Sequence, residues 1–364
     1  MDRTRAAVAL AGLAALAVAM GIGRFAFTPL LPMMQDDAGI SLAQGGYLAS
    51  ANYLGYLAGA LLAMRPARAD VAIRAALLAI ALTTFAMGYA HGMLVWTVLR
   101  ALAGVASAWA LVHVSSWCLA QAPAGIVFSG VGWGIALAGV LCLALMHAGV
   151  SSSQAWIALG GVSLVVTAFV WPMVGEGPAR KAAARFIWTA DRARLVICYG
   201  AFGFGYIIPA TFVPAMAKNI IDDPAIFGWA WPLFGATAAV STLFVVGTRR
   251  VWTVAALAMS AGVAAPIIIP GAAGIVASAL LVGGTFMVIT MAGMQEAREV
   301  AGADAPALMA AMTAAFAAGQ IAGPLLVAVL LHAGGGLSSA LAIAAASLVV
   351  SAIALKSKEK PCPT

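Results

Sequence analysis

Long apolar stretches alternate with short polar joints along the whole chain of 364 residues. A segment needs roughly 20 predominantly apolar residues to cross the hydrocarbon core of a bilayer, which is about 30 Å thick. In lipid each backbone N–H and C=O group must bond within its own segment, so these stretches are expected to be helices. The pattern predicts twelve membrane-spanning helices, at residues 6–34, 43–64, 71–90, 92–117, 124–149, 154–174, 192–217, 225–247, 250–269, 271–294, 305–332 and 336–355.

Basic residues are concentrated at alternate joints. Of the 19 Lys and Arg residues, sixteen lie at joints or chain ends that share one side of the membrane, and only Lys218 lies on the other side. Cytoplasmic loops of membrane proteins carry the excess of Lys and Arg, so both termini are expected in the cytoplasm. The net charge of +7 is then a consequence of topology and predicts no nucleic-acid partner.

Composition excludes a water-soluble protein, because 64% of the residues are hydrophobic and 9% are charged. The longest joint, 175–191, links six predicted helices to six others. We therefore expect an N-terminal bundle at 1–174, a cytoplasmic linker at 175–191 and a C-terminal bundle at 192–364. The four cysteines and four histidines have no ligand spacing, so neither a metal nor a cofactor is expected. The predicted location is the inner membrane of a bacterium.

An internal repeat relates the two predicted bundles, because matched residues stand half a chain length apart. Six pairs share this offset: Gly21 and Gly203, Gly23 and Gly205, Pro32 and Pro214, Gly46 and Gly228, Tyr47 and Trp229, and Arg68 and Arg250. Six spans return the chain to its starting side, so the two halves are expected to run parallel about an axis along the membrane normal.

Three segments carry a family resemblance: GIGRFAFTPLLP, QGGYLASANYLGYLAGALLA and MQEAREVAGADAPALMAAMTAAFAAGQIAGPLL. They resemble the YbfB/YjiJ-type bacterial branch of the major facilitator superfamily. Arg100 followed by Gly104 is similar to motif B of that superfamily, and SGVGWGIALAG loosely resembles motif C without its Gly-Pro. The loop MRPARAD departs from the usual form of motif A. The resemblance implies the major facilitator fold of two pseudo-symmetric six-helix bundles, with alternating access to a central site.

Two arginines fall inside apolar stretches. Counting 1.5 Å per residue places Arg24 about 15 Å and Arg100 about 12 Å from the outer ends of their helices. All twelve Asp and Glu residues map to helix ends or joints, so an electropositive cavity is expected. Such arginines can bind a substrate carboxylate, phosphate or sulfonate, or they can brace backbone carbonyls that Gly or Pro leaves open. Binding is favoured for Arg24 and bracing for Arg100, and both are kept as candidate substrate contacts.

Polar residues within the predicted helices complete the candidate substrate site: Asn52, Tyr56, Tyr206 and Gln320. Tyr206 occupies the repeat position of Arg24, which would place its hydroxyl across the cavity. Each of these residues, taken alone, is more often a hydrogen bond between helices than a ligand contact.

Small residues and prolines predict close, sliding helix contacts and bends at gates. The candidate gating and packing residues are Gly21, Gly23, Pro32, Gly55, Gly59, Gly104, Gly203, Gly205, Pro214, Gly323 and Pro324. The same residues would also suit a rigid bundle.

The sequence predicts a secondary transporter that moves a small solute, with an organic anion as the favoured class. The predicted protein is a monomer in the lipid bilayer, has no catalytic residues, and has the proton as a candidate coupling ion. One alternative is a drug or metabolite exporter with a largely apolar cavity. A membrane-embedded enzyme is less favoured, because no cluster of His, Asp, Glu or Cys marks one interface. A non-transporting sensor is disfavoured, because no appended soluble domain is present to pass on a signal.

Overall fold

The first helix of the protein changes its winding in its middle. The computed structural model describes residues 3–65, 67–175, 187–218, 229–245 and 247–356. In it α1 (Arg3–Leu16) runs into a π-helical stretch, η1 (Ala17–Phe25), which is followed by α2 (Phe27–Asp37). Stretches of π-helix occur mostly as short interruptions of α-helices and are frequent at functional sites.

The rest of the described chain is also helical and contains no strand. The further helices are α3 (Leu42–Ala63), α4 (Ala69–Met87), α5 (Met93–Cys118), α6 (Ala124–His147), α7 (Ser152–Val170), α8 (Ala190–Lys218), α10 (Ala230–Phe244), α11 (Arg249–Ile268), α12 (Ala272–Ala301), the 3-10 turn η2 (Gly302–Asp304), α13 (Ala305–His332) and α14 (Leu337–Lys356).

Apolar side chains cover the outside of this helical bundle. Leu94, Val165 and Phe244 are exposed to 79%, 71% and 82%, and many other large apolar residues are exposed with them. Such a surface suits lipid and would be costly in water. Within the described chain, nine helical segments are long and apolar enough to cross a membrane, and α10 is an apolar helix of shorter length. The prediction of an all-helical, multi-pass membrane protein is confirmed.

Several predicted helix boundaries were wrong. The helix predicted at 6–34 extends from Arg3 to Asp37, and the one predicted at 271–294 continues to Ala301. The longer α12 is explained by Glu296, which is buried and pairs with Arg249 at the start of α11 at 2.5 Å. The polar last turns of α12 therefore pack against α11. Residues 176–186 of the predicted linker lie outside the described residues, and so does the start of the helix predicted at 225–247.

Polar residues define where two of the helices begin. Ser41 accepts from the backbone N–H of Gln44, whose side chain accepts from the backbone N–H of Ser41 at the start of α3. Ser151 and Gln154 form the same capping box at the start of α7. This motif satisfies N–H groups that have no partner within the helix.

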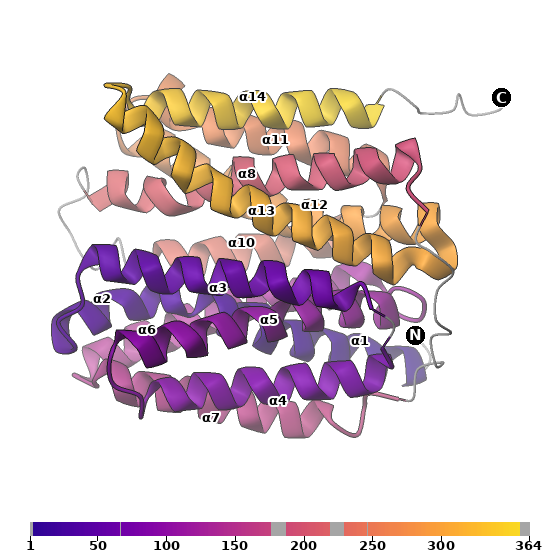
Figure 1. The fold of residues 1–364 in the computed structure, drawn as a ribbon, viewed down its shortest axis with the longest axis horizontal. Helices are drawn as coiled ribbons and strands as arrows, with labels where there is room; N and C mark the ends of the chain where they lie inside the picture. Colours follow the sequence, from indigo (N-terminus) through magenta and orange to yellow (C-terminus); the bar gives the residue numbers. More distant parts are fainter. Residues whose placement is uncertain (1–2, 66, 176–186, 219–228, 246, 357–364) are drawn as a thin grey trace.

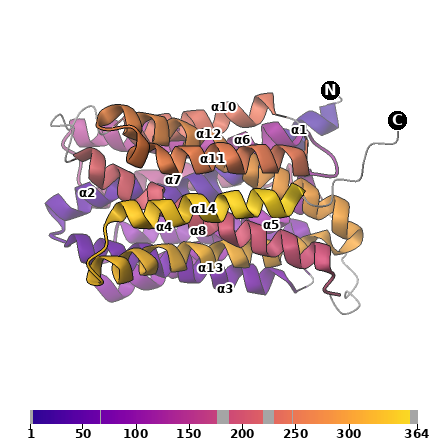
Figure 2. The ribbon, with the colours of Figure 1, turned by 90° about the horizontal axis from the view of Figure 1, so that it is seen from above.

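The long helices lie side by side with their axes along the length of the molecule (Figures 1 and 2). The start of α1 and the end of α14 lie at the same end of the bundle (Figure 1). This arrangement agrees with an even number of membrane crossings between the two.

The helix pairs that pack in the first part of the chain recur in the second part. The α3–α5, α4–α7 and α6–η1 pairs match α10–α12, α11–α14 and α13–α8 in chain order. The two parts meet through α3 against α13 and α6 against α10, which is also a matched pair of contacts. The repeat in the sequence therefore corresponds to a repeat in helix packing.

Glycines allow the closest of these helix contacts. Gly55 and Gly59 of α3 lie against the backbone of Ala101 and Val105 in α5, so that a side chain at either glycine would collide with main-chain atoms. Gly104 of α5 lies in the same way against the backbone of α3 at Asn52. Small residues at such positions let helix backbones approach closely in membranes.

The repeat glycines have matched surroundings. Gly21 lies against the backbone of Gly134 in α6, and Gly203 lies against the backbone of Phe316 in α13. The next glycine pair of the repeat contacts side chains instead, because Gly23 faces Ile80 and Gly205 faces Leu348. Gly323 of α13 also contacts a side chain, that of Ile207.

The candidate prolines lie within continuous helices. Pro32 lies inside α2 and Pro324 inside α13. Pro214 falls in α8, and its side chain lies outside the described part of the structure.

Replacing Gly59 by Leu is expected to lower the melting temperature of the purified protein in detergent. A side chain there has to displace the backbone of α5, and overpacking of this kind costs about 1–3 kcal/mol. Gly161→Leu is the matched control, because nothing lies within 4 Å of a Cβ added at that glycine. Equal melting temperatures for the two variants would contradict the close α3–α5 contact.

Candidate functional site

The π-helical stretch η1 forms one wall of the site and is held by polar side chains of α5. Ser107 donates from Oγ to the backbone oxygen of Ala19 at 2.7 Å. Arg100 donates from Nη1 to the oxygen of Gly23 at 3.1 Å and from Nη2 to the oxygen of Arg24 at 3.2 Å. Side chains from a neighbouring helix therefore satisfy carbonyl groups of the altered winding.

Arg100 is itself fixed from several sides. Its guanidinium carbon lies 4.8 Å from the centre of the Phe27 ring. Asn52 of α3 donates from Nδ2 to the backbone oxygen of Arg100 at 3.0 Å. Arg100 and Asn52 are both buried, and they tie α3, α5 and η1 together at one point. Their contacts match the bracing interpretation of Arg100.

Arg24 lies at the contact between the first and second parts of the chain. Its guanidinium carbon lies over the Tyr56 ring, 3.8 Å from the ring centre, and the centre of the Tyr53 ring is 5.4 Å away by the same measure. Its Nη2 donates to Oε1 of Gln320 in α13. Both side chains are buried, with exposures of 3% for Arg24 and 0% for Gln320. This hydrogen bond joins residues that are 296 positions apart.

Several N–H groups of Arg24 and Gln320 have no hydrogen-bond acceptor in the described chain. Among the described residues, Nε and Nη1 of Arg24 and Nε2 of Gln320 have no hydrogen-bond partner. No described carboxylate forms an ion pair with Arg24. The ion pairs of the described chain lie at helix ends instead, for example between Glu296 and Arg249. A buried N–H group without a partner costs about 1–3 kcal/mol, and more when it is charged. The arrangement is therefore suited to accept an anion or a group rich in acceptor atoms.

Tyr206 is buried beside the same region but packs as part of an aromatic cluster. Its ring stacks on Phe286 with 4.3 Å between ring centres. Phe286 in turn meets Phe25, the neighbour of Arg24, edge to face at 5.8 Å. Phe202 and Phe316 complete this group, which we call the aromatic cluster (Phe25, Phe202, Tyr206, Phe286 and Phe316). The structure thus places Tyr206 against rings of the second part of the chain, and Phe286 links it to Phe25 of the first part.

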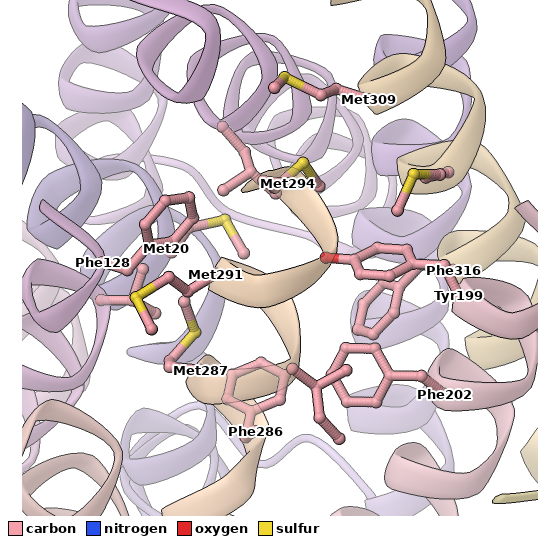
Figure 3. Close-up of a cluster of buried hydrophobic side chains, with 14 of the residues drawn as sticks. Met20, Phe128, Tyr199, Phe202, Phe286, Met287, Met291, Met294, Met309 and Phe316 are labelled. Carbon is pink, nitrogen blue, oxygen red and sulfur yellow. The ribbon is translucent and has the colours of Figure 1, made fainter. Parts of the chain in front are cut away.

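Buried methionines of α12 extend the apolar region beyond the aromatic cluster. Met287, Met291 and Met294 follow one another at helical spacing and form what we call the methionine stripe; all three are buried. Figure 3 shows them gathered with Met20 and Phe128 on one side and with Tyr199 and Phe316 on the other. Met20 belongs to η1 and Phe128 to α6, so the stripe lies between the two parts of the chain.

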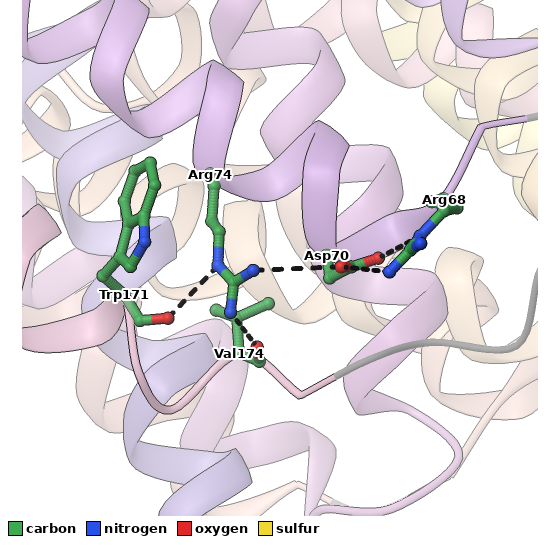
Figure 4. Close-up of polar contacts among 5 residues, drawn as sticks. All are labelled: Arg68, Asp70, Arg74, Trp171 and Val174. Atoms are coloured by element: carbon green, nitrogen blue, oxygen red, sulfur yellow. Dashed lines mark hydrogen bonds and ion pairs between the residues drawn. The ribbon is translucent and has the colours of Figure 1, made fainter.

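A separate polar group fastens the start of α4 to the end of α7 (Figure 4). Buried Asp70 pairs with Arg68 at 3.0 Å and with Arg74 at 3.8 Å. Arg74 also donates to the backbone oxygens of Trp171 at 3.2 Å and Val174 at 2.8 Å. Arg68 and Asp70 belong to the segment that departs from motif A, and the group connects helices of the same part of the chain.

One polar contact joins the two parts at the end of the bundle where the chain begins. Arg298 in the last turns of α12 donates from Nη1 to the backbone oxygen of Leu119 at 2.6 Å, just beyond the end of α5. Gln295, Arg298 and Glu299 line a small cleft there with Leu119 and Ala122. A cation at the C-terminus of a helix interacts favourably with the helix dipole.

Ser107 and the phenylalanines of the aromatic cluster are not among the site residues that the sequence predicted. Ser107 follows Arg100 by seven residues, which is two helical turns, so the shared helix face was a usable signal. The phenylalanines carry no such signal, because nothing in their spacing separates a lining residue from a core residue.

The sequence matches a family model over residues 16–356, and that family is described as "Uncharacterised MFS-type transporter YbfB". The fold is similar to that of the human organic anion transporter MFSD10 (TETRAN), with a TM-score of 0.74, 11% identity, and coverage of 98% of this chain and 100% of that chain. It is also similar to FucP, a major facilitator superfamily transporter in the outward conformation, with a TM-score of 0.73, 13% identity, and coverage of 95% and 97%. No curated protein sequence matches this chain.

These findings define a multi-pass membrane transporter of the major facilitator superfamily. Within that superfamily, the chain belongs to the YbfB-type family, as its sequence motifs predicted. The likeness to the solved structures shows the fold alone, because the identities are low.

Replacing Arg100 by Gln is expected to lower the melting temperature of the protein. The change removes donors from the buried carbonyls of Gly23 and Arg24, and each buried group left without a partner costs about 1–3 kcal/mol. Arg250→Gln is the control, because Arg250 is exposed at the start of α11. An Arg100 variant that melts like the wild type and no longer binds anions would instead assign Arg100 to the substrate.

Proposed function

We propose that this protein is a secondary transporter that carries a small organic anion across the bacterial inner membrane by alternating access. The observation that carries the proposal is the buried guanidinium of Arg24. It has two nitrogens without a partner and no carboxylate beside it among the described residues. An uncompensated charge within a membrane is costly and usually serves function. An anionic substrate would supply the missing countercharge and acceptors.

The proposed topology has twelve spans in two six-helix bundles, at 1–174 and 192–364. One of the nine candidate segments contains both α12 and α13. Counting these two helices separately and adding α3 and α10 gives twelve spans. The matched helix pairs support two related bundles. The distribution of Lys and Arg in the sequence supports cytoplasmic termini.

Alternating access would proceed by movement of one bundle against the other at the α3–α13 and α6–α10 contacts. Glycine contacts support sliding at α6–α10, where Gly132 and Gly235 each lie against the backbone of the opposite helix. The hydrogen bond between Arg24 and Gln320 joins the bundles at the centre, and the bond between Arg298 and Leu119 joins them at the proposed cytoplasmic end. Opening toward the cytoplasm would break the second bond.

The coupling proposed for this transporter does not use a carboxylate at the central site, because Arg24 has none beside it among the described residues. A proton carried by the substrate itself, exchange of one anion for another, and uniport are all compatible with this site. We propose a monomer as the transporting unit.

An exporter of apolar drugs or metabolites is the second candidate function. The aromatic cluster and the methionine stripe favour it, because both are apolar and lie between the bundles. Arg24 and Arg100 are buried and have no acidic partner in the part of the chain that the structure describes, which disfavours hydrophobic cations as its substrates.

Organic anions are expected to raise the melting temperature of the detergent-purified protein, because a ligand that binds only the folded state stabilises it. In Arg24→Gln this stabilisation should disappear. In Arg24→Lys it should be strongly reduced, because lysine keeps the charge and loses the planar set of donors. Arg250→Gln is the control. Stabilisation by lipophilic cations that persists in Arg24→Gln would contradict the proposal and favour the exporter.

Replacing Arg298 by Ala is expected to open the cytoplasmic end of the protein more often. The lost bond to Leu119 has a charged donor, and bonds of this kind contribute about 1.5–3 kcal/mol, which corresponds to roughly tenfold or more in population. Labelling of a single cysteine placed at Ala122 with a charged maleimide measures this opening in inside-out vesicles. Arg250→Ala is the control, and unchanged labelling in Arg298→Ala would exclude a gating role for the bond.

A further inference from the structure

Arg24 brings polar donors and aromatic rings close together. The donors without partners among the described residues are Nε and Nη1 of Arg24 and Nε2 of Gln320. The ring of Phe25 lies 5.6 Å from the guanidinium carbon and begins the aromatic cluster. The same ring lies 5.8 Å from Phe286, and Trp231 lies 6.1 Å from it. A ligand held by Arg24 would therefore extend its other end toward rings.

The aromatic cluster and the methionine stripe contain no charged residue. A second acidic group on the ligand would lie among these side chains without a countercharge. Isolated ionised groups in such surroundings carry a large desolvation cost. The site is thus matched to one acidic group, at Arg24, and to an uncharged remainder.

The methionine stripe makes this region adaptable. Met287 and Met291 are unbranched, and they face Met20 of η1 across the contact between the bundles (Figure 3). Methionine side chains fill irregular space, make favourable contacts with aromatic rings, and are frequent at surfaces that bind varied apolar partners. They can turn aside for a ring or an alkyl chain that enters between the bundles.

We infer that the ligand of this site is an amphipathic monoanion, that is, a carboxylate or sulfonate with an aromatic or alkyl body. Its acidic group is held by Arg24 and Gln320, and its body lies against Phe286 and the methionine stripe. This inference rests on the proposed function and specifies its substrate class. It excludes small hydrophilic anions, dicarboxylates and inorganic phosphate as the preferred ligands.

Binding of matched ligands to the purified full-length protein tests the inference. Phenylacetate is the probe, with acetate, succinate and phosphate as hydrophilic anions and benzyl alcohol as the neutral aromatic compound. We expect phenylacetate to bind about tenfold or more tightly than each of the others, because only it offers both an acidic group and apolar area to bury. Calorimetry measures the affinities. Tighter binding of succinate or phosphate, lost in Arg24→Gln, would overturn the inference and leave the proposed function standing.

Substitutions at Phe286 and Met291 test where the aromatic or alkyl part of the ligand lies. Phe286→Leu is expected to weaken phenylacetate binding about tenfold and to change acetate binding by less than about twofold. Phe169→Leu is the matched control, because Phe169 is 55% exposed on α7. Met291→Leu is a milder variant for the same lining, should Phe286→Leu fail to fold. Unchanged phenylacetate affinity in both would place the ligand elsewhere. Absence of binding by every anion in the wild type would overturn the proposed function as well.

Discussion

The buried guanidinium of Arg24 is the constraint on which the centre of the structure depends. The charge is buried, and no carboxylate among the described residues pairs with it, so neighbouring side chains must stabilise it. The guanidinium carbon lies over the Tyr56 ring, and the Gln320 oxygen accepts one of its N–H groups. These two contacts come from different parts of the chain. The placement of the cation therefore depends on the relative position of the first and second parts of the chain.

The backbone at Arg24 is held by hydrogen bonds from α5. The π-helical winding of η1 presents the backbone oxygens of Ala19, Gly23 and Arg24 to α5, where Ser107 and Arg100 bond to them. Close approach of α3 to α5 through Gly55 and Gly59 brings Tyr56 up to the guanidinium. The glycine contacts between α3 and α5 and the hydrogen bonds from α5 to η1 thus act together. A wider spacing of α3 and α5 would separate Arg24 from Tyr56.

A transporter needs a central contact that can be exchanged for substrate. We propose this role for the Arg24–Gln320 hydrogen bond, because it leaves donors of both residues without partners among the described residues. An anion that binds there would accept from these donors and compete with the Gln320 oxygen for Nη2 of Arg24, which would loosen the link between the two parts of the chain. The methionine stripe and the glycine contacts at α6–α10 would then allow the neighbouring surfaces to shift with little loss of packing.

Sequence alone determined the helical, membrane-embedded class of this protein, the repeat and the family, because hydrophobic length and charge placement act locally along the chain. It also singled out Arg24, since a charge inside an apolar span is conspicuous. The sequence left the partners of Arg24 and Arg100 open and predicted Tyr206 across a cavity, whereas Tyr206 packs against Phe286 in the structure. Only the tertiary structure decided that Arg100 holds the backbone while Arg24 reaches Gln320. Contacts between residues 296 positions apart follow from how helices pack in three dimensions, and no local pattern records them.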